Sequence, residues 1–357
     1  MKVVIQAGGN GTRLWPISRK NKPKQFVKLL NNETLFTQTV KRFKHIKDED
    51  LIILGNINHK EFIEEELKIN KLKNPKVFLE PKAMNTAPSV CAAIQYLMDN
   101  NCKDEIVVFC PSDHYMNDIQ AFIETLKIGE KLAENNKVVC FGIQPLYPET
   151  GYGYIKVGER ISENAFTVEK FVEKPNIERA IEFLKDGGYL WNGGIFMAKV
   201  SVLHDLFKKY QEKLLKNIEL TLKNSKEENN IIFLNKEYFE KVDEISMDYA
   251  IIENLNSSNL ATVPLKLVWS DVGSYKSLYD IDNDKTKEKN IVNGKAVLHN
   301  TENCFIRSNG KIICCSDVDD LVIVEEGDII LVMKKDKSQN IKKLIEKCKE
   351  ENFEKIL

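Results

Sequence analysis

Short runs of consecutive apolar residues alternate with amphipathic segments through the first part of the chain. The apolar runs are Val3–Ile5, Leu51–Leu54, Val77–Leu79, Ile106–Cys110 and Val138–Gly142. Segments with helical periodicity lie between them, at Leu35–Phe43, His59–Ile69, Thr86–Met98 and Ile119–Ala133. Asn85 is the expected N-cap of the third helix. Because continuous apolar runs suit parallel strands buried on both faces, we predict an α/β fold. Its core would be a Rossmann-like mixed, mostly parallel sheet with helices on both faces.

The pattern changes twice further along the chain. Between residues 150 and 285, strands are expected at Tyr154–Val157, Thr167–Glu173 and Gly194–Lys199. Helices are expected at Glu178–Leu184, Val202–Tyr210, Glu212–Leu222 and Met247–Asn254, and a surface loop at Asn224–Asn230. Beyond a charged stretch near residue 285, short β-type runs alternate with turn residues, which fits a β-solenoid or a β-meander. We predict two domains, 1–285 and 286–357, the second β-rich and β-helix-like with a terminal helix at Gln339–Lys349.

Composition narrows the possible classes of protein. Lys and Arg total 52 and Asp and Glu total 53, so no basic surplus points to a nucleic-acid partner. No apolar run reaches the roughly 18–20 residues that span a membrane, and Met1–Gln6 is too short for a signal-peptide core. We therefore expect a cytoplasmic protein without a membrane partner. The 8 Cys include no C-x-x-C pair and the 5 His are scattered, which favours reduced thiols over a zinc site.

A glycine-rich loop follows the first apolar run. Its residues are Ala7, Gly8, Gly9, Asn10, Gly11, Thr12 and Arg13. Three glycines let backbone N–H groups approach an anion closely, and the Arg13 side chain adds a planar, permanently charged donor. The loop lacks the GxxxxGK[ST] pattern, and a dinucleotide fingerprint would need glycine where Leu14 stands, so dinucleotide oxidoreduction is disfavoured. We predict a phosphate-binding loop; the alternative is a glycine-rich turn without function.

The loop and the residues after it resemble the signature of the sugar nucleotidylyltransferases. The segment AGGNGTRLWPISRKNKPKQFVKL contains RLWP-x-SR followed by PKQF, which is similar to the mannose-1-phosphate guanylyltransferases in particular. Further segments resemble the family in the same order along the chain: EPKAMNTAPSVCAA, PSDHYM, GIQPLYPETGYGYI, FVEKP, WNGGIFMAK, SMDYAIIEN and WSDVGSY. The remainder of the chain matches more loosely, as a terminal β domain.

The resemblance implies a nucleotidyl transfer. The phosphate of a sugar 1-phosphate would attack the α-phosphorus of a nucleoside triphosphate, and pyrophosphate would leave. For the guanylyltransferases the substrates are GTP and mannose 1-phosphate, and the products are GDP-mannose and pyrophosphate. A phosphate monoester, with a second pKa of about 6, is already mostly dianionic at neutral pH and needs no general base. Charge neutralisation and in-line alignment are what such a reaction requires.

The resemblance also implies roles for individual residues. Arg13 and Lys24 would stabilise the β- and γ-phosphates and the leaving pyrophosphate, while Asp113 and Asp271 would hold Mg²⁺. The residues expected to contact the nucleotide are Ala7, Gly8, Gly9, Gly11, Thr12, Arg13, Lys24, Glu80, Asn85, Thr86, Ala87 and Ser112. Those expected to contact the sugar phosphate are Gly153, Glu173, Lys174 and Asn192. The competing structural explanations are turn residues for Asp113, Asp271 and Asn192 and a solvated basic face for Lys24.

Other functions stay open at this point. The same chemistry could serve another sugar 1-phosphate, such as a heptose, or another base. A non-catalytic homologue could bind a sugar nucleotide without turnover. Relatives that also isomerise mannose 6-phosphate carry an extra cupin-like domain, so the transferase alone is expected here. Because open-edged β repeats commonly need a partner or a cap, the terminal β domain favours a homodimer.

Overall fold

The computed structural model describes residues 1–9, 11–19, 21–30, 32–353 and 355, and these form two compact units. The first unit comprises Met1–Gly8, Thr39–Ser112 and Asn117–Leu267. The second comprises Gly9–Gln38, Asp113–Met116 and Val268–Leu357. Since each unit combines several segments, no single cut in the chain separates them. The predicted domain boundary between residues 285 and 286 stays a prediction.

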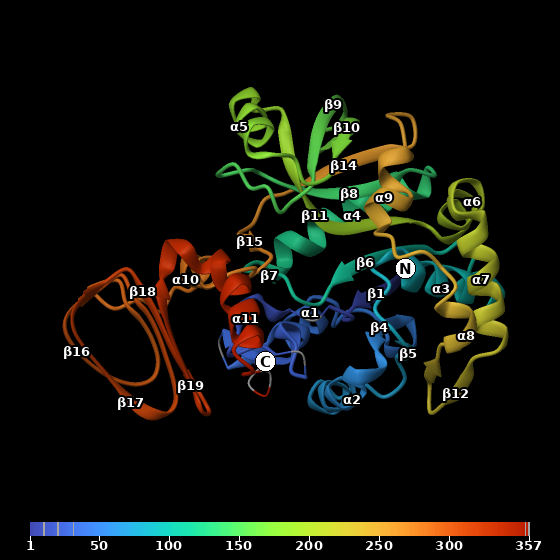
Figure 1. Cartoon of the computed structure of the whole chain (residues 1–357). Helices are drawn as coiled ribbons and strands as arrows, with labels where there is room; N and C mark the ends of the chain where they lie inside the picture. Colours follow the sequence, from blue (N-terminus) through green and yellow to red (C-terminus); the bar gives the residue numbers. More distant parts are fainter. Residues whose placement is uncertain (10, 20, 31, 354, 356–357) are drawn as a thin grey trace. The chain divides into compact units, whose positions relative to one another are not determined.

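A large mixed sheet forms the centre of the first unit (Figure 1). Among the described residues it has 11 strands, in the order β12-β13-β5-β4-β1-β6-β11-β8-β14-β10-β9. Their bounds are β1 (Lys2–Gln6), β4 (Leu51–Asn56), β5 (Lys76–Glu80), β6 (Ile106–Pro111), β8 (Val138–Ile143), β9 (Tyr154–Ser162), β10 (Ala165–Val172), β11 (Tyr189–Lys199), β12 (Lys226–Glu228), β13 (Ile231–Phe233) and β14 (Leu260–Leu265). Strands β13, β5, β4, β1 and β6 run parallel, as do β8 and β14. Strand β11 runs antiparallel to both β6 and β8, so the predicted Rossmann-like mixed sheet is confirmed.

Helices cover both faces of this sheet. They are α2 (Lys60–Ile69), α3 (Ala87–Asp99), α4 (Ile119–Glu134), α5 (Ile177–Asp186), α6 (Val200–Tyr210), α7 (Glu212–Lys223), α8 (Lys236–Phe239) and α9 (Met247–Ala250). Helices α3, α6 and α7 bury apolar side chains in one cluster with Val4 and Ile52. Val3 and Ile53 are equally buried but point to the opposite face, because successive side chains of a strand alternate. Helix α4 packs against Phe141 on that opposite face.

Two local expectations are corrected by the structure. Thr86, and not Asn85, is the N-cap of α3. Asn85 instead adopts a left-handed backbone with φ of 63°, and its Oδ1 accepts a hydrogen bond from the Thr86 N–H at 3.0 Å. The predicted loop Asn224–Asn230 contains strand β12, which pairs antiparallel with β13. All three β12 side chains are exposed, because β12 lies at the sheet edge, where a wholly polar sequence is tolerated.

The second unit is held together by one hydrophobic cluster that includes Leu14, Trp15, Tyr275, Phe305 and Ile341. The buried Tyr275 hydroxyl donates a hydrogen bond to the Leu14 carbonyl oxygen at 2.8 Å. The elements of this unit are η1 (Thr12–Leu14), η2 (Lys24–Phe26), β2 (Lys28–Leu30), β3 (Glu33–Thr34), β7 (Tyr115–Met116), β15 (Trp269–Ser270), α10 (Tyr275–Ile281), β16 (Ile291–Glu302), β17 (Phe305–Asp319), β18 (Leu321–Glu326), β19 (Ile329–Lys334), η6 (Lys335–Asn340) and α11 (Ile341–Glu350). Helix α1 (Leu35–Arg42) continues from this unit into the first.

The sequence left open whether the β-rich part of the second unit is a β-solenoid or a β-meander, and the strand pairing distinguishes the two. Strands β16, β17 and β18 pair in parallel, and β18 turns back into the antiparallel strand β19. Figure 1 shows β16 and β17 curving as successive turns of a coil. The parallel strands therefore form a short solenoid that ends in a hairpin, and the predicted terminal helix is present as α11.

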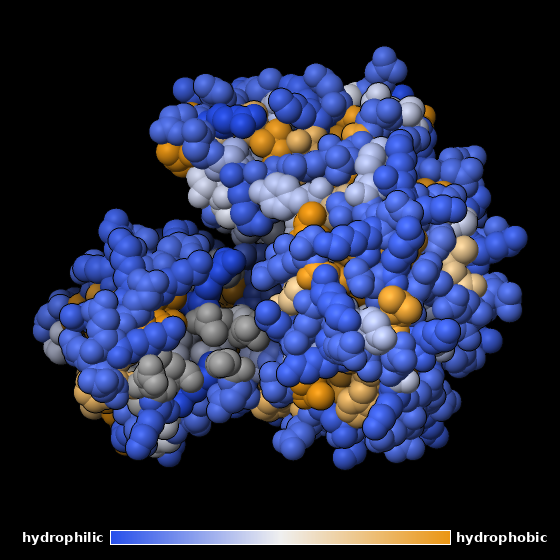
Figure 2. Space-filling view, turned by 45° about the vertical axis from the view of Figure 1, so that its right-hand side comes forward, coloured by the Kyte–Doolittle hydropathy of each residue, from blue (hydrophilic) through white to orange (hydrophobic). Residues whose placement is uncertain are grey.

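The face of the molecule drawn in Figure 2 is mostly polar. On the face shown in Figure 2, hydrophobic residues form small, separate groups within a largely hydrophilic surface. Within the described ranges, no helix is both long enough and apolar enough to cross a bilayer. All 8 cysteines are free thiols, and most of them are buried.

Candidate active site

The parallel strands of the first unit have their carboxyl ends on the same side of the sheet. Gln6 at the end of β1 lies opposite Pro111 at the end of β6, and Glu80 ends β5 nearby. Buried Ser112 donates to the Gln6 carbonyl oxygen from its N–H at 2.9 Å and from its Oγ at 2.8 Å. Ala7 and Gly8 leave the sheet on this same side. Open α/β sheets bind their ligands at the carboxyl ends of parallel strands.

Glu80 stands out among the residues predicted to contact the nucleotide. Its side chain is buried, with 5% of the residue exposed, and its Oε2 has no hydrogen-bond partner among the described residues. Burial raises the pKa of the Glu80 carboxyl to about 8, although a hydrogen bond from the Asn56 side chain acts to lower it. A Cβ atom placed on Gly8 would lie 2.9 Å from Glu80 Oε1. The carboxyl group therefore lies directly against the start of the phosphate-binding loop.

The next predicted nucleotide segment, Asn85 to Ala87, holds a neighbouring part of the chain in place. The Thr86 Oγ1 accepts a hydrogen bond from the Met247 N–H at 2.8 Å. The Ala87 N–H donates to the Ile245 carbonyl oxygen at 3.1 Å. Asn85 is exposed. These polar atoms of Thr86 and Ala87 thus anchor the first residue of α9 and the segment before it.

The four residues predicted to contact the sugar phosphate come together in the first unit, and we refer to Gly153, Glu173, Lys174 and Asn192 as the sugar cluster. The Asn192 N–H donates to the Gly153 carbonyl oxygen at 2.8 Å. A Cβ atom on Gly153 would lie 2.5 Å from Glu173 Oε2, and the Lys174 ammonium donates to the Glu173 carboxylate. Asn192 pairs with Gly142 near the end of β8, so the cluster lies at the carboxyl edge of that strand.

Asp248 adjoins the sugar cluster and is not among the predicted site residues. It lies in the first turn of α9, and its Oδ1 accepts a hydrogen bond from Asn192 Nδ2 at 2.9 Å. Burial and the neighbouring Glu173 raise the pKa of the Asp248 carboxyl to about 6, although Lys174 acts to lower it. The segment SMDYAIIEN resembles the family, but nothing in its spacing shows that a short helix turns this carboxyl toward Asn192.

The four residues predicted to act in catalysis all lie in the second unit. Lys24 Nζ lies 2.9 Å from Asp113 Oδ2 and donates to the Asp271 backbone carbonyl oxygen at 2.5 Å. Arg13 Nη1 lies 3.7 Å from Asp271 Oδ2. Lys24 is buried, whereas the Arg13 side chain is 45% exposed. Although burial alone would raise it, the Lys24 ammonium holds the pKa of the Asp113 carboxyl below its usual value.

The phosphate-binding loop is folded onto Lys24. Gly11 has a left-handed φ of 52°, and a Cβ atom there would lie only 2.5 Å from Lys24 Cβ. Gln25 Nε2 donates to the Gly9 carbonyl oxygen at 2.8 Å, and Ser18 Oγ donates to the Gly11 carbonyl oxygen at 2.5 Å. Glycine at position 11 is therefore what allows the close approach of loop and lysine. The side chain of Thr12 lies outside the described residues.

Asp113 and Asp271, the residues predicted to hold a divalent cation, are both partly exposed acidic residues near Lys24. Their side chains are 34% and 19% exposed, and both residues place an oxygen within hydrogen-bond distance of the Lys24 ammonium. Mg²⁺ usually takes one or two protein carboxylates and fills its other positions with water and phosphate oxygens. His114 packs edge-on against Trp269, with 5.2 Å between ring centroids, which fits a packing role for this histidine.

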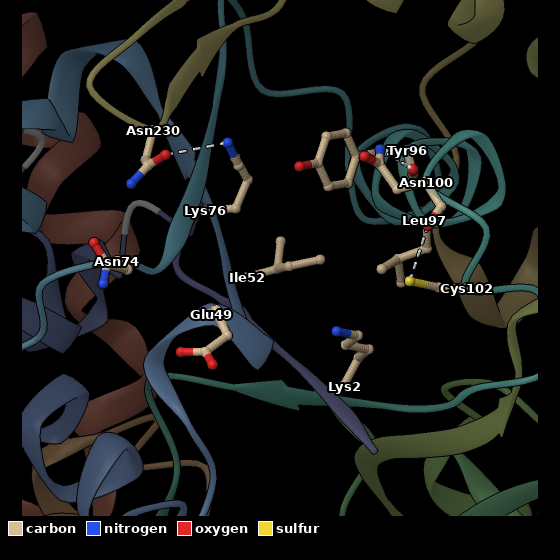
Figure 3. A pocket seen from close by; sticks show the side chains of 10 residues that line it. All are labelled: Lys2, Glu49, Ile52, Asn74, Lys76, Tyr96, Leu97, Asn100, Cys102 and Asn230. Atoms are coloured by element: carbon tan, nitrogen blue, oxygen red, sulfur yellow. Dashed lines mark hydrogen bonds between the residues drawn. The ribbon is translucent and has the colours of Figure 1, made fainter.

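A cavity of about 580 Å³ lies in the first unit at the amino ends of the parallel strands, opposite the carboxyl ends described above (Figure 3). It is lined by Lys2 and Lys76, the first residues of β1 and β5, together with Tyr96 and several asparagines. Lys2 pairs with Asp50 and Lys76 pairs with Glu227, so carboxylates neutralise both cations. None of the predicted site residues lines this cavity.

The comparisons with known proteins identify the class. Residues 2–288 match the family described as Nucleotidyl transferase. Residues 294–348 match the MannoseP isomerase/GMP-like beta-helix domain. The chain therefore belongs to the nucleotidyl transferase family. Enzymes of this family generally use a divalent metal ion, and their substrates are a nucleoside triphosphate and a sugar 1-phosphate.

Two related proteins and one solved structure are similar to this chain over nearly its whole length. The alginate biosynthesis protein AlgA of Pseudomonas aeruginosa is 36% identical over 96% of this chain and 71% of its own length. The mannose-1-phosphate guanylyltransferase RfbM of Salmonella typhimurium is 36% identical over 97% of this chain and 72% of its own length. A solved structure from Thermus thermophilus, described as a mannose-1-phosphate geranyltransferase, superimposes with a TM-score of 0.86 at 27% identity. It covers 98% of this chain and 99% of its own.

Proposed function

We propose that this chain transfers GMP from GTP to α-D-mannose 1-phosphate, giving GDP-mannose and pyrophosphate, with Mg²⁺ as the metal ion. The relative from Salmonella typhimurium carries the name of this activity at 36% identity, which supports the choice of sugar. The observation that supports the choice of base is the buried, unpartnered Oε2 of Glu80 beside Gly8.

Guanine is the base that complements an ionised Glu80. The carboxyl, whose pKa is about 8 in the free protein, would release its proton when guanine binds, because two N–H donors stabilise the charged form. Its Watson–Crick edge carries two neighbouring N–H donors, N1–H and N2–H, and a carboxylate offers two acceptor oxygens. A donor placed on the buried Oε2 would remove the cost of leaving that oxygen unsatisfied. Adenine and cytosine present an acceptor beside a donor, so one lone pair would face another. Sites built around such buried polar groups reject the wrong partner strongly.

The catalytic residues would act by binding and charge neutralisation. One oxygen of the sugar phosphate bonds to the α-phosphorus, the bond from that phosphorus to the bridging oxygen breaks, and pyrophosphate leaves with the electron pair. Arg13 and Lys24 would stabilise the charge on the departing pyrophosphate. Mg²⁺ held by Asp113 and Asp271 would neutralise phosphate oxygens. Lys174 would bind the sugar phosphate, and Glu173 and Asn192 the sugar hydroxyls.

A substrate panel tests the proposal. Pyrophosphate release is measured with each of four nucleoside triphosphates against mannose, glucose and heptose 1-phosphates. We expect the highest kcat/KM for GTP with mannose 1-phosphate. If pyrophosphate were released only with a heptose 1-phosphate, the proposed sugar substrate would be wrong. If it were released only with UTP, the proposed nucleotide would be wrong. No release from any pair would leave a non-catalytic sugar-nucleotide-binding homologue as the function.

Substitution of Glu80 by glutamine tests the basis of base selection. The change Glu80→Gln replaces one acceptor by an N–H₂ donor, which suits the acceptor–donor edge of adenine. We expect kcat/KM for GTP to fall by roughly 100-fold, the loss of about two charge-assisted hydrogen bonds, and kcat/KM for ATP to rise. The exposed helix residue Glu212, changed to glutamine, is the matched control and should leave both values unchanged. An equal loss of kcat/KM for every nucleotide would show that Glu80 does not select the base.

We also propose a homodimer and a cytoplasmic location. The two outer strands of the β-rich sheet, β16 and β19, expose the apolar side chains Val297, Ile330 and Val332. Exposed edges and apolar side chains of this kind favour pairing with a second copy. Sedimentation velocity at several concentrations tests this, and a monomer throughout would contradict the dimer. Cell fractionation tests the location, which follows from the proposed use of GTP.

A further inference from the structure

We infer that Asp248 is a positioning residue for the sugar 1-phosphate, because it fixes the orientation of the Asn192 side-chain amide. The inference rests on the proposed function, since it assumes that the sugar cluster binds this substrate. Asp248 itself need not touch the sugar. Its effect is transmitted through a hydrogen bond to a residue of the cluster.

The Asn192 amide is held from two sides. Its Nδ2 donates to Asp248 Oδ1 at 2.9 Å, and its Oδ1 accepts from the Gly194 N–H at 3.1 Å. A carboxylate can only accept hydrogen bonds, so the NH₂ group of the amide has to face Asp248. This leaves one N–H of Asn192 as a donor and one lone pair as an acceptor for substrate hydroxyls. A flipped amide would exchange these two groups and mismatch the hydroxyls.

Asp248 is itself held in place by the predicted nucleotide segment. The preceding residues Ile245 and Met247 are hydrogen-bonded to Ala87 and Thr86. Ser246 caps α9, because its Oγ accepts from the Tyr249 N–H at 3.3 Å. The backbone that carries Asp248 is therefore held by contacts that do not depend on the sugar cluster. A rigid support of this kind is what holds a binding group within the small tolerance that binding needs.

The charged groups around Asp248 set the pH above which its carboxylate orients the Asn192 side-chain amide. Glu173 and Lys174 act on the carboxyl from the loop after β10, and the buried thiol of Cys140 faces it from β8. Glu253 lies one contact further away, where its Oε1 accepts from the Glu173 N–H. Burial and Glu173 raise the pKa of Asp248 to about 6. Above that pH the carboxylate can only accept, so it enforces the orientation of the Asn192 amide. Below it a protonated carboxyl could also donate, and only the Gly194 N–H would still require Asn192 Oδ1 to face it.

The kinetic test is the variant Asp248→Asn, which keeps the shape of the side chain and adds a donor. We expect KM for mannose 1-phosphate to rise by roughly 10-fold, with KM for GTP and kcat at saturation within about 2-fold. The variant Asp186→Asn is the matched control, because Asp186 pairs with Lys156 on the exposed part of the same unit. A rise in both KM values, or in neither, would overturn the inference.

An NMR titration tests the same inference without catalysis. Protein labelled with ¹⁵N-asparagine is followed from pH 5 to pH 8, with the Asn192 side-chain signals assigned from an Asn192→Ala variant. We expect these signals to shift with a midpoint near 6 in the native protein and to stay constant in Asp248→Asn. Constant signals in the native protein would overturn the inference. Because no substrate is added, a failure of the proposed function leaves this result unaffected, so the two failures can be told apart.

Discussion

The charged residues predicted to act in catalysis, in the second unit, differ from the carboxyl groups of Glu80 and Asp248 in the first unit. The former are paired with opposite charges, and the latter have no such pairing within the described residues. Lys24 contacts both Asp113 and Asp271, and Arg13 lies near Asp271, so each charge has an opposite charge close by. In the first unit, Glu80 has a buried oxygen without a partner, and Asp248 lies beside a second carboxyl group. The pKa of Asp113 is lowered, whereas those of Glu80 and Asp248 are raised.

The difference separates two tasks. A triphosphate is common to all four nucleotides, and a set of paired charges can bind it without distinguishing one nucleotide from another. The base and the sugar differ between substrates, and a buried group that lacks a partner favours the ligand that supplies one. Such a group lowers the stability of the free protein, because an unsatisfied buried polar atom carries its full desolvation cost. Selectivity and stability are therefore opposed in the first unit.

The largest expected effect comes from removing charge in the second unit. Asp113→Asn and Asp271→Asn should each lower kcat by about 100-fold or more, because neutralisation of the phosphates is the main catalytic contribution. Circular dichroism and thermal unfolding should show an intact fold. Asp280→Asn is the matched control, since Asp280 pairs with Lys276 on the exposed surface of the same unit. Near-normal turnover in both variants at saturating Mg²⁺ would contradict the assignment of these carboxylates.

An intermediate effect is expected at the sugar cluster. Lys174→Ala should raise KM for the sugar 1-phosphate by roughly 10- to 100-fold with little change in KM for GTP, because one charged hydrogen bond to phosphate is lost. Lys156→Ala removes a half-buried lysine of the same unit that pairs with Asp186, outside the sugar cluster, and should change neither value. Initial-rate kinetics with each substrate varied in turn provides the measurement. Equal changes in the two KM values would show that this lysine does not distinguish the substrates.

The smallest expected effect concerns stability. Burial raises the pKa of Glu80 to about 8, so the folded protein retains a proton that the unfolded chain releases. This contribution to stability is complete below the ordinary pKa of glutamate and is lost as the pH rises toward 8. Glu80→Gln has no proton to lose, so its Tm relative to the native protein should rise between pH 5 and pH 8.5, by roughly 2–4 °C for each kcal/mol.

Differential scanning fluorimetry across this pH range provides the measurement. Glu212→Gln is the control, because the pKa of the exposed Glu212 carboxyl is lowered and it does not titrate in this range. A Tm difference between Glu80→Gln and the native protein that stays constant with pH would show that Glu80 is ionised in the free protein. The contrast between the two regions would then rest on Asp248 alone.

The strands of the parallel core could be predicted closely from the sequence. The apolar runs at Val3–Ile5 and Val77–Leu79 lie within β1 and β5, which extend one residue further at each end. Strands buried on both faces need apolar residues at every position, and this leaves a clear local pattern. The polar edge strand β12 has no such pattern, because it is recognised only through its pairing with β13.

The candidate site could be predicted where a motif carries it. Gly11, Arg13 and Lys24 stand in one short segment, and Gly153, Glu173 and Asn192 fall in segments that resemble the family. Asp248 is different, because its position depends on contacts between segments about 160 residues apart in the chain. The orphaned oxygen of Glu80 depends in the same way on what surrounds it. Burial and missing partners are properties of the packed structure and leave no local pattern in the sequence.

The hydrophobic cluster of the second unit has a consequence for how the protein is made. Leu14 and Trp15 share this cluster with Tyr275, Phe305 and Ile341. At about 5–20 residues per second, a ribosome needs tens of seconds to reach these partners after it has made Leu14. Until then the apolar residues that support the phosphate-binding loop have no core to enter and are available to chaperones. The loop is thus among the first segments to be synthesised and among the last to complete its folding.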